Sequence, residues 1–169
     1  MIARFLLVAV ILGTQDVGAQ EQAAFLRVRY VPVEDRIDSV RVADIDRSWS
    51  RVLVLRKTNQ SEEVLREVKA NESFGARFSV DGDFNGDGKP DKALVGVYQE
   101  KSGATGRFLL VLTELKPGVW RKSFLAKFKG EPGFSILFVE GATIDFATCL
   151  RCDAGLRLVW ARGRYELRR

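Results

Sequence analysis

Short apolar runs separated by glycine-rich turns occupy the second half of the chain. Residues 93–98, 108–112 and 134–139 are nearly continuous apolar stretches, which is the pattern of strands covered on both faces. The connections between them, such as 102–106 and 130–133, are rich in glycine and short enough for hairpins. Successive hairpins place each strand antiparallel to the one before it. This half of the chain therefore predicts an antiparallel β-meander.

The first half of the chain adds helical signals. Alternating apolar and charged residues predict a strand over 26–30, whereas an apolar stripe at helical spacing predicts a short helix over 61–70. Asn59 and Glu62 have the spacing of a capping box for that helix. Residues 33–57 fit a loop, short strands or a helix. We expect an α+β fold that is mainly an antiparallel β-meander of hairpins, with one or two short helices packed on one face.

The first 19 residues have the pattern of a secretory signal peptide. Arg4 precedes an apolar core at residues 5–12, and small or tolerated residues at 17–19 suit cleavage before Gln20. The apolar run is too short for a permanent anchor, and no second run of spanning length follows. We expect a signal peptide at 1–19 and a single secreted or periplasmic domain at 20–169, with no transmembrane segment in the mature form.

Composition restricts the chemistry of the chain. It contains no histidine, which excludes Ser/His/Asp and Cys/His hydrolases and most catalytic zinc sites. The 27 Lys and Arg residues exceed the 22 Asp and Glu residues, for a net charge of +5, but no run of five or six like charges occurs. A nucleic-acid-binding tail is therefore not expected.

A dense polar segment at 81–91 is the most specific motif in the chain. Oxygen-bearing side chains recur on alternate residues around Gly88, so that they can turn toward one centre, and Ca²⁺ prefers six to eight hard oxygen ligands. The predicted ligands are the side chains of Asp83, Asn85, Asp87 and Asp91 and the backbone carbonyl of Lys89. Leu94 stands where an EF-hand needs a bidentate Glu, so the motif is not an EF-hand. The alternative is a polar turn between two strands.

Residues 83–93 resemble the calcium loop of FG-GAP/VCBS-type repeats, which form integrin-alpha-type propeller blades. In that family the loop joins two strands, and the resemblance implies that the five positions named above bind calcium. A propeller needs several blades, whereas this loop pattern occurs once in the chain. We therefore expect a single FG-GAP-like unit and not a full propeller.

Two further features carry weaker signals. Cys149 and Cys152 are expected to form a short disulfide in an oxidising compartment, with a thiol-redox pair and a metal site as alternatives. The arginines of the last predicted hairpin fit a solvated face first, and the alternative is an anion-binding surface. Its residues are Arg157, Arg162, Arg164 and Arg168.

These features together predict a secreted or periplasmic calcium-binding module with a non-catalytic interaction or structural role. Its expected partners are a glycan, an envelope component or an acidic protein, and its oligomeric state is left open. The first alternative is a secreted carboxylate-dependent hydrolase, because acidic residues distant in sequence can meet in space. The second alternative is a CxxC thiol-redox protein.

Overall fold

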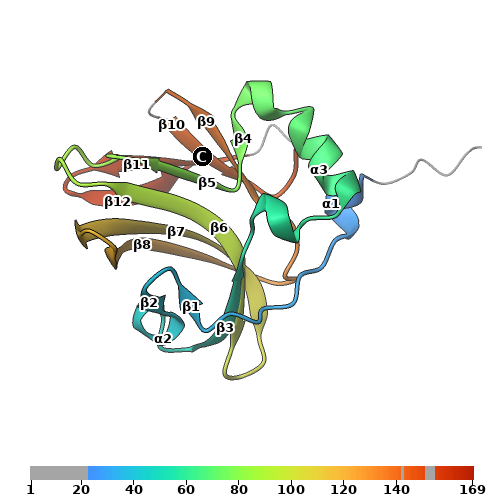
Figure 1. The fold of residues 1–169 in the computed structure, drawn as a ribbon, viewed down its shortest axis with the longest axis horizontal. Helices are drawn as coiled ribbons and strands as arrows, with labels where there is room; N and C mark the ends of the chain where they lie inside the picture. The colour runs from blue at the N-terminus through green and yellow to red at the C-terminus, as the bar shows by residue number, and fades with distance from the viewer. Residues whose placement is uncertain (1–22, 142, 151–154) are drawn as a thin grey trace, which may run out of the picture.

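The structure is a computed structural model and describes residues 23–141, 143–150 and 155–169. Within this part of the chain, two antiparallel sheets stack on each other, and short helices lie at their edges (Figure 1). The predicted signal peptide at 1–19 lies outside the described residues. None of the helices in the described ranges has the length and hydrophobicity needed to span a bilayer.

The first sheet has the strand order β3-β6-β7-β8, with β5 paired to the other end of β6. Its strands are β3 (Trp49–Val54), β5 (Ser79–Gly82), β6 (Asp91–Glu100), β7 (Thr105–Lys116) and β8 (Val119–Lys129).

The second sheet has the order β12-β11-β10-β9-β4. Its strands are β4 (Ala76–Arg77), β9 (Ile136–Glu140), β10 (Thr143–Ala147), β11 (Leu156–Ala161) and β12 (Arg164–Arg168). A separate two-stranded hairpin consists of β1 (Arg36–Ile37) and β2 (Val40–Arg41).

The helical elements are few and short, which fits the predicted α+β class. They are α1 (Ala24–Arg27), α2 (Val42–Ile45), α3 (Glu62–Lys69) and the 3₁₀ turns η1 (Lys57–Asn59) and η2 (Glu72–Phe74). In the described residues the sheets form neither a closed barrel nor a propeller. The expected fold, a mainly antiparallel meander with few short helices, is therefore confirmed.

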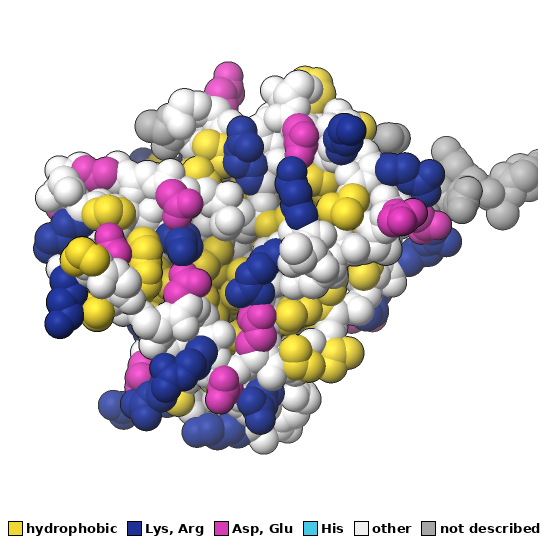
Figure 2. Space-filling view, in the orientation of Figure 1, with side chains coloured by type: hydrophobic (Ala, Val, Ile, Leu, Met, Phe, Trp, Pro, Cys, Tyr) yellow, Lys and Arg dark blue, Asp and Glu magenta, His cyan; other side chains and the backbone are white. Residues whose placement is uncertain are grey.

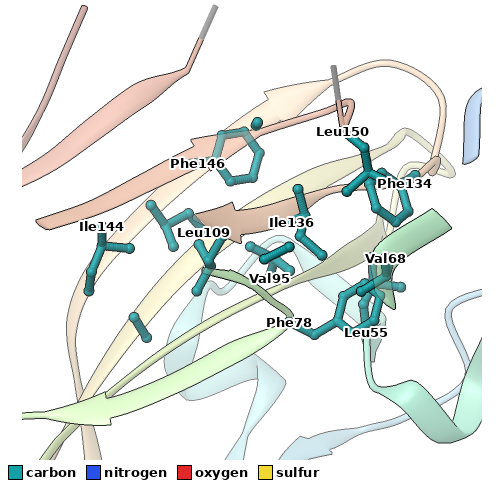
Figure 3. Close-up of a cluster of buried hydrophobic side chains, with 14 of the residues drawn as sticks. Leu55, Val68, Phe78, Val95, Leu109, Phe134, Ile136, Ile144, Phe146 and Leu150 are labelled. Atoms are coloured by element: carbon teal, nitrogen blue, oxygen red, sulfur yellow. The ribbon is translucent and has the colours of Figure 1, made fainter. Parts of the chain in front are cut away.

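Strands β6 and β7 are buried on both faces, as their continuous apolar runs predict. On one face, Val95 and Leu109 join α3 and the second sheet in the larger core (Figure 3). On the other face, Tyr98 and Phe108 pack with Trp49 in a second core that β1, β2 and α2 cover. The first sheet is thus the middle layer of the molecule (Figure 1).

Two local predictions are wrong. Residues 26–30 do not form a strand, because helix α1 buries Phe25 and leaves Leu26 51% exposed, and Arg29 makes only an isolated bridge to Gly133. The cap of α3 is Ser61, whose hydroxyl accepts a hydrogen bond from the N–H of Val64 at 3.3 Å, and not Asn59. An alternation over only five residues cannot by itself distinguish a strand from one helical turn with a single buried residue.

Candidate calcium loop and the adjoining groove

The polar segment forms the tip of the hairpin between β5 and β6. The two strands pair antiparallel from Ser79 opposite Leu94 to Gly82 opposite Asp91, so that residues 83–90 connect them. Gly86 and Gly88 have φ values of +72° and +79°, in the left-handed region that glycine adopts without a steric penalty. The loop therefore joins two strands, as the sequence predicts.

Side-chain oxygens organise the loop backbone. Asp83 accepts hydrogen bonds from the backbone N–H groups of Gly86 and Asp87 at 2.8 and 3.1 Å through Oδ1, and from that of Gly88 at 2.9 Å through Oδ2. Asn85 accepts from Asp87 N–H at 2.8 Å, and Asp87 accepts from Lys89 N–H at 2.9 Å. The loop backbone therefore wraps around the side chains of residues 83, 85 and 87. The three side chains reach solvent, since Asp83 and Asp87 are exposed and Asn85 is half-buried.

Asp91 lies apart from these side chains, in the protein core. Its exposed fraction is 0%, and both carboxylate oxygens are hydrogen bonded. Oδ2 accepts from the hydroxyl of Tyr165 at 2.6 Å and from the backbone N–H of Phe84 at 3.1 Å, and Oδ1 accepts from the hydroxyl of Thr113. Since Thr113 uses its only proton on Asp91, the 2.6 Å contact between Thr113 and Ser123 requires Ser123 to be the donor. Asp91 thus connects the loop to β7, β8 and β12.

Tyr165 acts as a hydrogen-bond donor to Asp91. Burial and, secondly, the hydrogen bond to Asp91 raise the pKa of the Tyr165 phenol, so it keeps its proton near neutral pH. Its ring also contacts Trp160, the residue opposite it on β11, edge-on at a centroid distance of 4.8 Å. The Asp91 hydrogen-bond network is therefore in contact with an exposed tryptophan, since Trp160 is 42% exposed.

The donor chemistry of the loop fits calcium. The side chains offer only carboxylate and amide oxygens, the hard ligands that Ca²⁺ prefers over the nitrogen and sulfur ligands of zinc or copper. A carboxylate has about four lone-pair sites, so the three bonds that Asp91 accepts leave it one. In the described part of the chain, no group of three or more His, Cys, Asp or Glu side chains is already arranged around a common point. Calcium coordination by Asp83, Asn85, Asp87, Lys89 and Asp91 therefore stays a prediction.

Two cavities, of about 400 and 330 Å³, open beside the loop. Both are lined by Asn85, Trp160 and Tyr165, so they adjoin each other and together form one groove. The larger cavity lies toward β10 and β11, and the smaller one toward β8. We call this surface the Trp160 groove.

Three of the four arginines predicted to bind anions already have acidic partners. Arg157 pairs with Asp145 at 2.9 Å, and Arg164 and Arg168 both pair with Glu166, at 3.1 and 3.0 Å. Arg162 lies in the turn between β11 and β12. Basic and acidic side chains are interspersed across the face of the molecule in Figure 2. An anion-binding role for this set stays a prediction.

The predicted disulfide involves a residue outside the described part of the chain. Cys149 is buried, with 4% of its surface exposed, near the end of β10. Cys152 falls in the segment 151–154, which the structure does not describe. The Cys149–Cys152 pairing and the redox alternative both stay predictions.

Several residues of the candidate site could not be predicted from the sequence. Nothing in the local pattern marks Thr113, Ser123 or Tyr165 as partners of Asp91, because the contacts cross between strands and between sheets. The pairing of Trp160 with Tyr165 could have been predicted from the sequence, because the tight turn at Arg162 and Gly163 places the two residues opposite each other.

Comparison with protein families gives one match. Residues 74–110 match the FG-GAP repeat, a range that runs from η2 through β4, β5, the loop and β6 into β7. This segment is a single FG-GAP-like module, in agreement with the resemblance of the loop sequence. Comparisons with curated proteins and with solved structures find no match.

Proposed function

We propose that this protein is a calcium-binding, non-catalytic interaction module that works outside the cytoplasm. The observation that carries the proposal is the loop geometry. Three oxygen-bearing side chains sit on an exposed loop whose backbone they already organise, and the loop is anchored through Asp91 in the core. An oxygen-only donor set held in this way suits calcium. The pattern at residues 1–19 supports a location outside the cytoplasm.

The pKa shifts of carboxylates across the described residues favour binding over hydrolysis. A carboxylate hydrolase uses an acid whose pKa is raised, so that the group is protonated at working pH. The carboxylates with a clearly shifted pKa, Asp44, Asp46, Glu72 and Glu166, are all shifted downward, through hydrogen bonds from Lys, Arg or Ser. Ion-paired surface carboxylates of this kind suit a binding module.

Thermal unfolding with calcium and with chelator tests the proposal. A ligand at about 100 times its dissociation constant stabilises the fold by roughly 2.7 kcal/mol if it binds only the folded state. For a domain of about 150 residues this corresponds to a rise in Tm of roughly 5–11 °C. Equal Tm values in calcium and in chelator would identify the loop as a polar turn.

Variants of the loop carboxylates, with a matched control, test whether calcium binds at the loop. Asp87→Asn keeps an acceptor for the Lys89 N–H but removes one negative charge, so it should weaken calcium binding and reduce the Tm increment. Asp83→Asn should do the same, and it should also lower the Tm in chelator, because Asp83 accepts through both oxygens and the amide replaces one of them with a donor. Asp81→Asn is the control, because Asp81 is an exposed residue of β5 outside the ligand pattern. An increment that survives both loop variants, or one that Asp81→Asn also removes, would place the ion elsewhere.

A further inference from the structure

The Trp160 groove combines a fixed aromatic surface with polar walls. Trp160 is among the exposed large hydrophobic residues, yet its ring is held edge-on by Tyr165, whose hydroxyl is bound to buried Asp91. An aromatic ring that is exposed and also held in place loses little conformational entropy on binding. Surface aromatics of this type are frequent anchors of binding sites.

The smaller cavity is lined by basic groups and by an acidic group. Arg121, Lys122 and Arg164 line it from β8 and β12, and Asn85 and Asp87 line it from the calcium loop. Lys122 donates to the backbone carbonyl of Ile45, and Arg164 is paired with Glu166.

Arg121 is the cation of this groove that is available to a ligand. It is exposed, and no carboxylate among the described residues pairs with it. It lies on β8 directly opposite Thr113, the residue that hydrogen bonds to Asp91. An anionic group on a ligand would therefore meet an unneutralised guanidinium, which can bind a carboxylate with two parallel hydrogen bonds.

We propose that the Trp160 groove binds an acidic saccharide, a sugar chain that carries carboxylate groups. The apolar C–H face of a sugar ring would stack on Trp160, and its carboxylate would pair with Arg121. Sugar hydroxyls suit Asn85, whose amide N–H groups donate, and Ser123, whose oxygen accepts; both residues line the same cavity. This chemistry explains why an exposed ring, a free guanidinium and neutral polar groups occur together.

Calcium should strengthen this binding. Asn85 and Asp87 are predicted calcium ligands and also line the groove. Without the ion, the Asp87 carboxylate repels an anionic ligand. With the ion bound, its two positive charges offset most of the negative charge of the predicted calcium-binding carboxylates Asp83, Asp87 and Asp91, so this repulsion falls. The calcium dependence rests on the proposed function, whereas stacking on Trp160 and pairing with Arg121 do not.

Calorimetric titration with a defined probe tests the proposal. The probe is the α-1,4-linked trimer of galacturonic acid, its methyl ester is the neutral control, and hexaglutamate represents an acidic peptide. The acidic trimer should bind in 1 mM calcium, about ten-fold more tightly than its methyl ester and more tightly than hexaglutamate. Chelation of calcium should weaken binding of the trimer by about five-fold, a typical size for coupling between two sites.

Variants test each part of the groove. Trp160→Ala should weaken trimer binding by about 30-fold, as expected for a central aromatic anchor. Arg121→Ala, at an exposed position, should weaken binding of the acidic trimer by about ten-fold and leave binding of the methyl ester unchanged. Phe74→Ala and Arg66→Ala are the controls, because Phe74 is a 70% exposed aromatic residue on a different cavity and Arg66 is an exposed arginine on α3.

The outcomes separate this proposal from the proposed function. If calcium binds but the trimer does not bind at up to 10 mM, the groove proposal is wrong and the calcium module stands. If the trimer binds through Trp160 and calcium does not bind at all, the calcium module is wrong and the groove proposal stands. Equal affinity for trimer and methyl ester, tighter binding of hexaglutamate, or insensitivity to both Trp160→Ala and Arg121→Ala would each overturn the acidic-saccharide assignment.

Discussion

Tyr165→Phe removes one hydroxyl and isolates the link between the calcium loop and the second sheet. The ring contacts to Trp160 and Phe124, at 4.8 and 6.1 Å, remain in place, while Asp91 loses the 2.6 Å hydrogen bond to Oδ2. A hydrogen bond to a charged group contributes about 1.5–3 kcal/mol, and a fully buried acceptor has no water to replace the lost donor. We therefore expect a loss of about 2 kcal/mol in the free energy of unfolding, or roughly 4–8 °C in Tm.

Urea unfolding in chelator measures this effect without a contribution from calcium. Tyr30→Phe is the matched control, because the hydroxyl of Tyr30 donates to Gln60, a neutral amide, and its loss should cost about 1 kcal/mol. The m-value should stay the same in both variants, since neither changes the surface exposed on unfolding. If Tyr165→Phe is no more destabilising than Tyr30→Phe, Asp91 does not depend on Tyr165 and the proposed anchoring of the loop is refuted.

Two further predictions concern the first sheet and its edge. Burial alone would raise the pKa of Asp46, but hydrogen bonds from Lys127 and Ser48 outweigh burial and hold the pKa at about 2. This lowered pKa stabilises the fold above pH 4, and the stabilisation is lost as the pH falls through 2. The stability difference between the wild type and Asp46→Asn, about 1 kcal/mol at pH 6 after solvent screening, should therefore shrink below pH 4 and vanish only below pH 2 in urea titrations. In Gly96→Ala, the new methyl group would lie 2.4 Å from the Phe108 ring and 2.5 Å from the carbonyl oxygen of Leu53, and overpacking of this kind destabilises by about 1–3 kcal/mol. An unchanged Tm for Gly96→Ala would show that the contact between β3 and β6 adjusts freely.

The sequence predicts the central strands better than the edges of the fold. Continuous apolar runs identify β6 and β7, because residues pointing to either face meet a core and must be apolar there. Residues 26–30 are misread because a short alternation also fits one helical turn with a single buried side chain. Helix α2 and hairpin β1–β2 stay ambiguous in sequence, since their packing depends on the second core and on contacts distant in the chain.

The candidate site also has one part that the sequence predicts and one part that it does not. The calcium pattern is local, so spacing alone identifies Asp83, Asn85 and Asp87 as side chains of one loop. The side-chain partners of Asp91 are 22 and 74 residues away in sequence, at Thr113 and Tyr165, and their positions depend on how the strands pair and how the two sheets stack. Sequence spacing therefore predicts the ligand types but gives no sign that Asp91 is buried under the loop.

The packing of β6 explains how one FG-GAP-like module can occur without a propeller around it. A repeat unit usually cannot bury its apolar faces alone and needs neighbouring repeats to cover them. Here β6 and β7 are covered on one face by β9–β12 and α3, and on the other by β1, β2 and α2 (Figure 1). Asp91 on β6 adds polar contacts between the two sheets. Its buried carboxylate accepts hydrogen bonds from Thr113 on β7 and from Tyr165 on β12. Segments outside the repeat thus take the place of neighbouring blades, and the same hydrogen bonds connect the loop to the groove beside it.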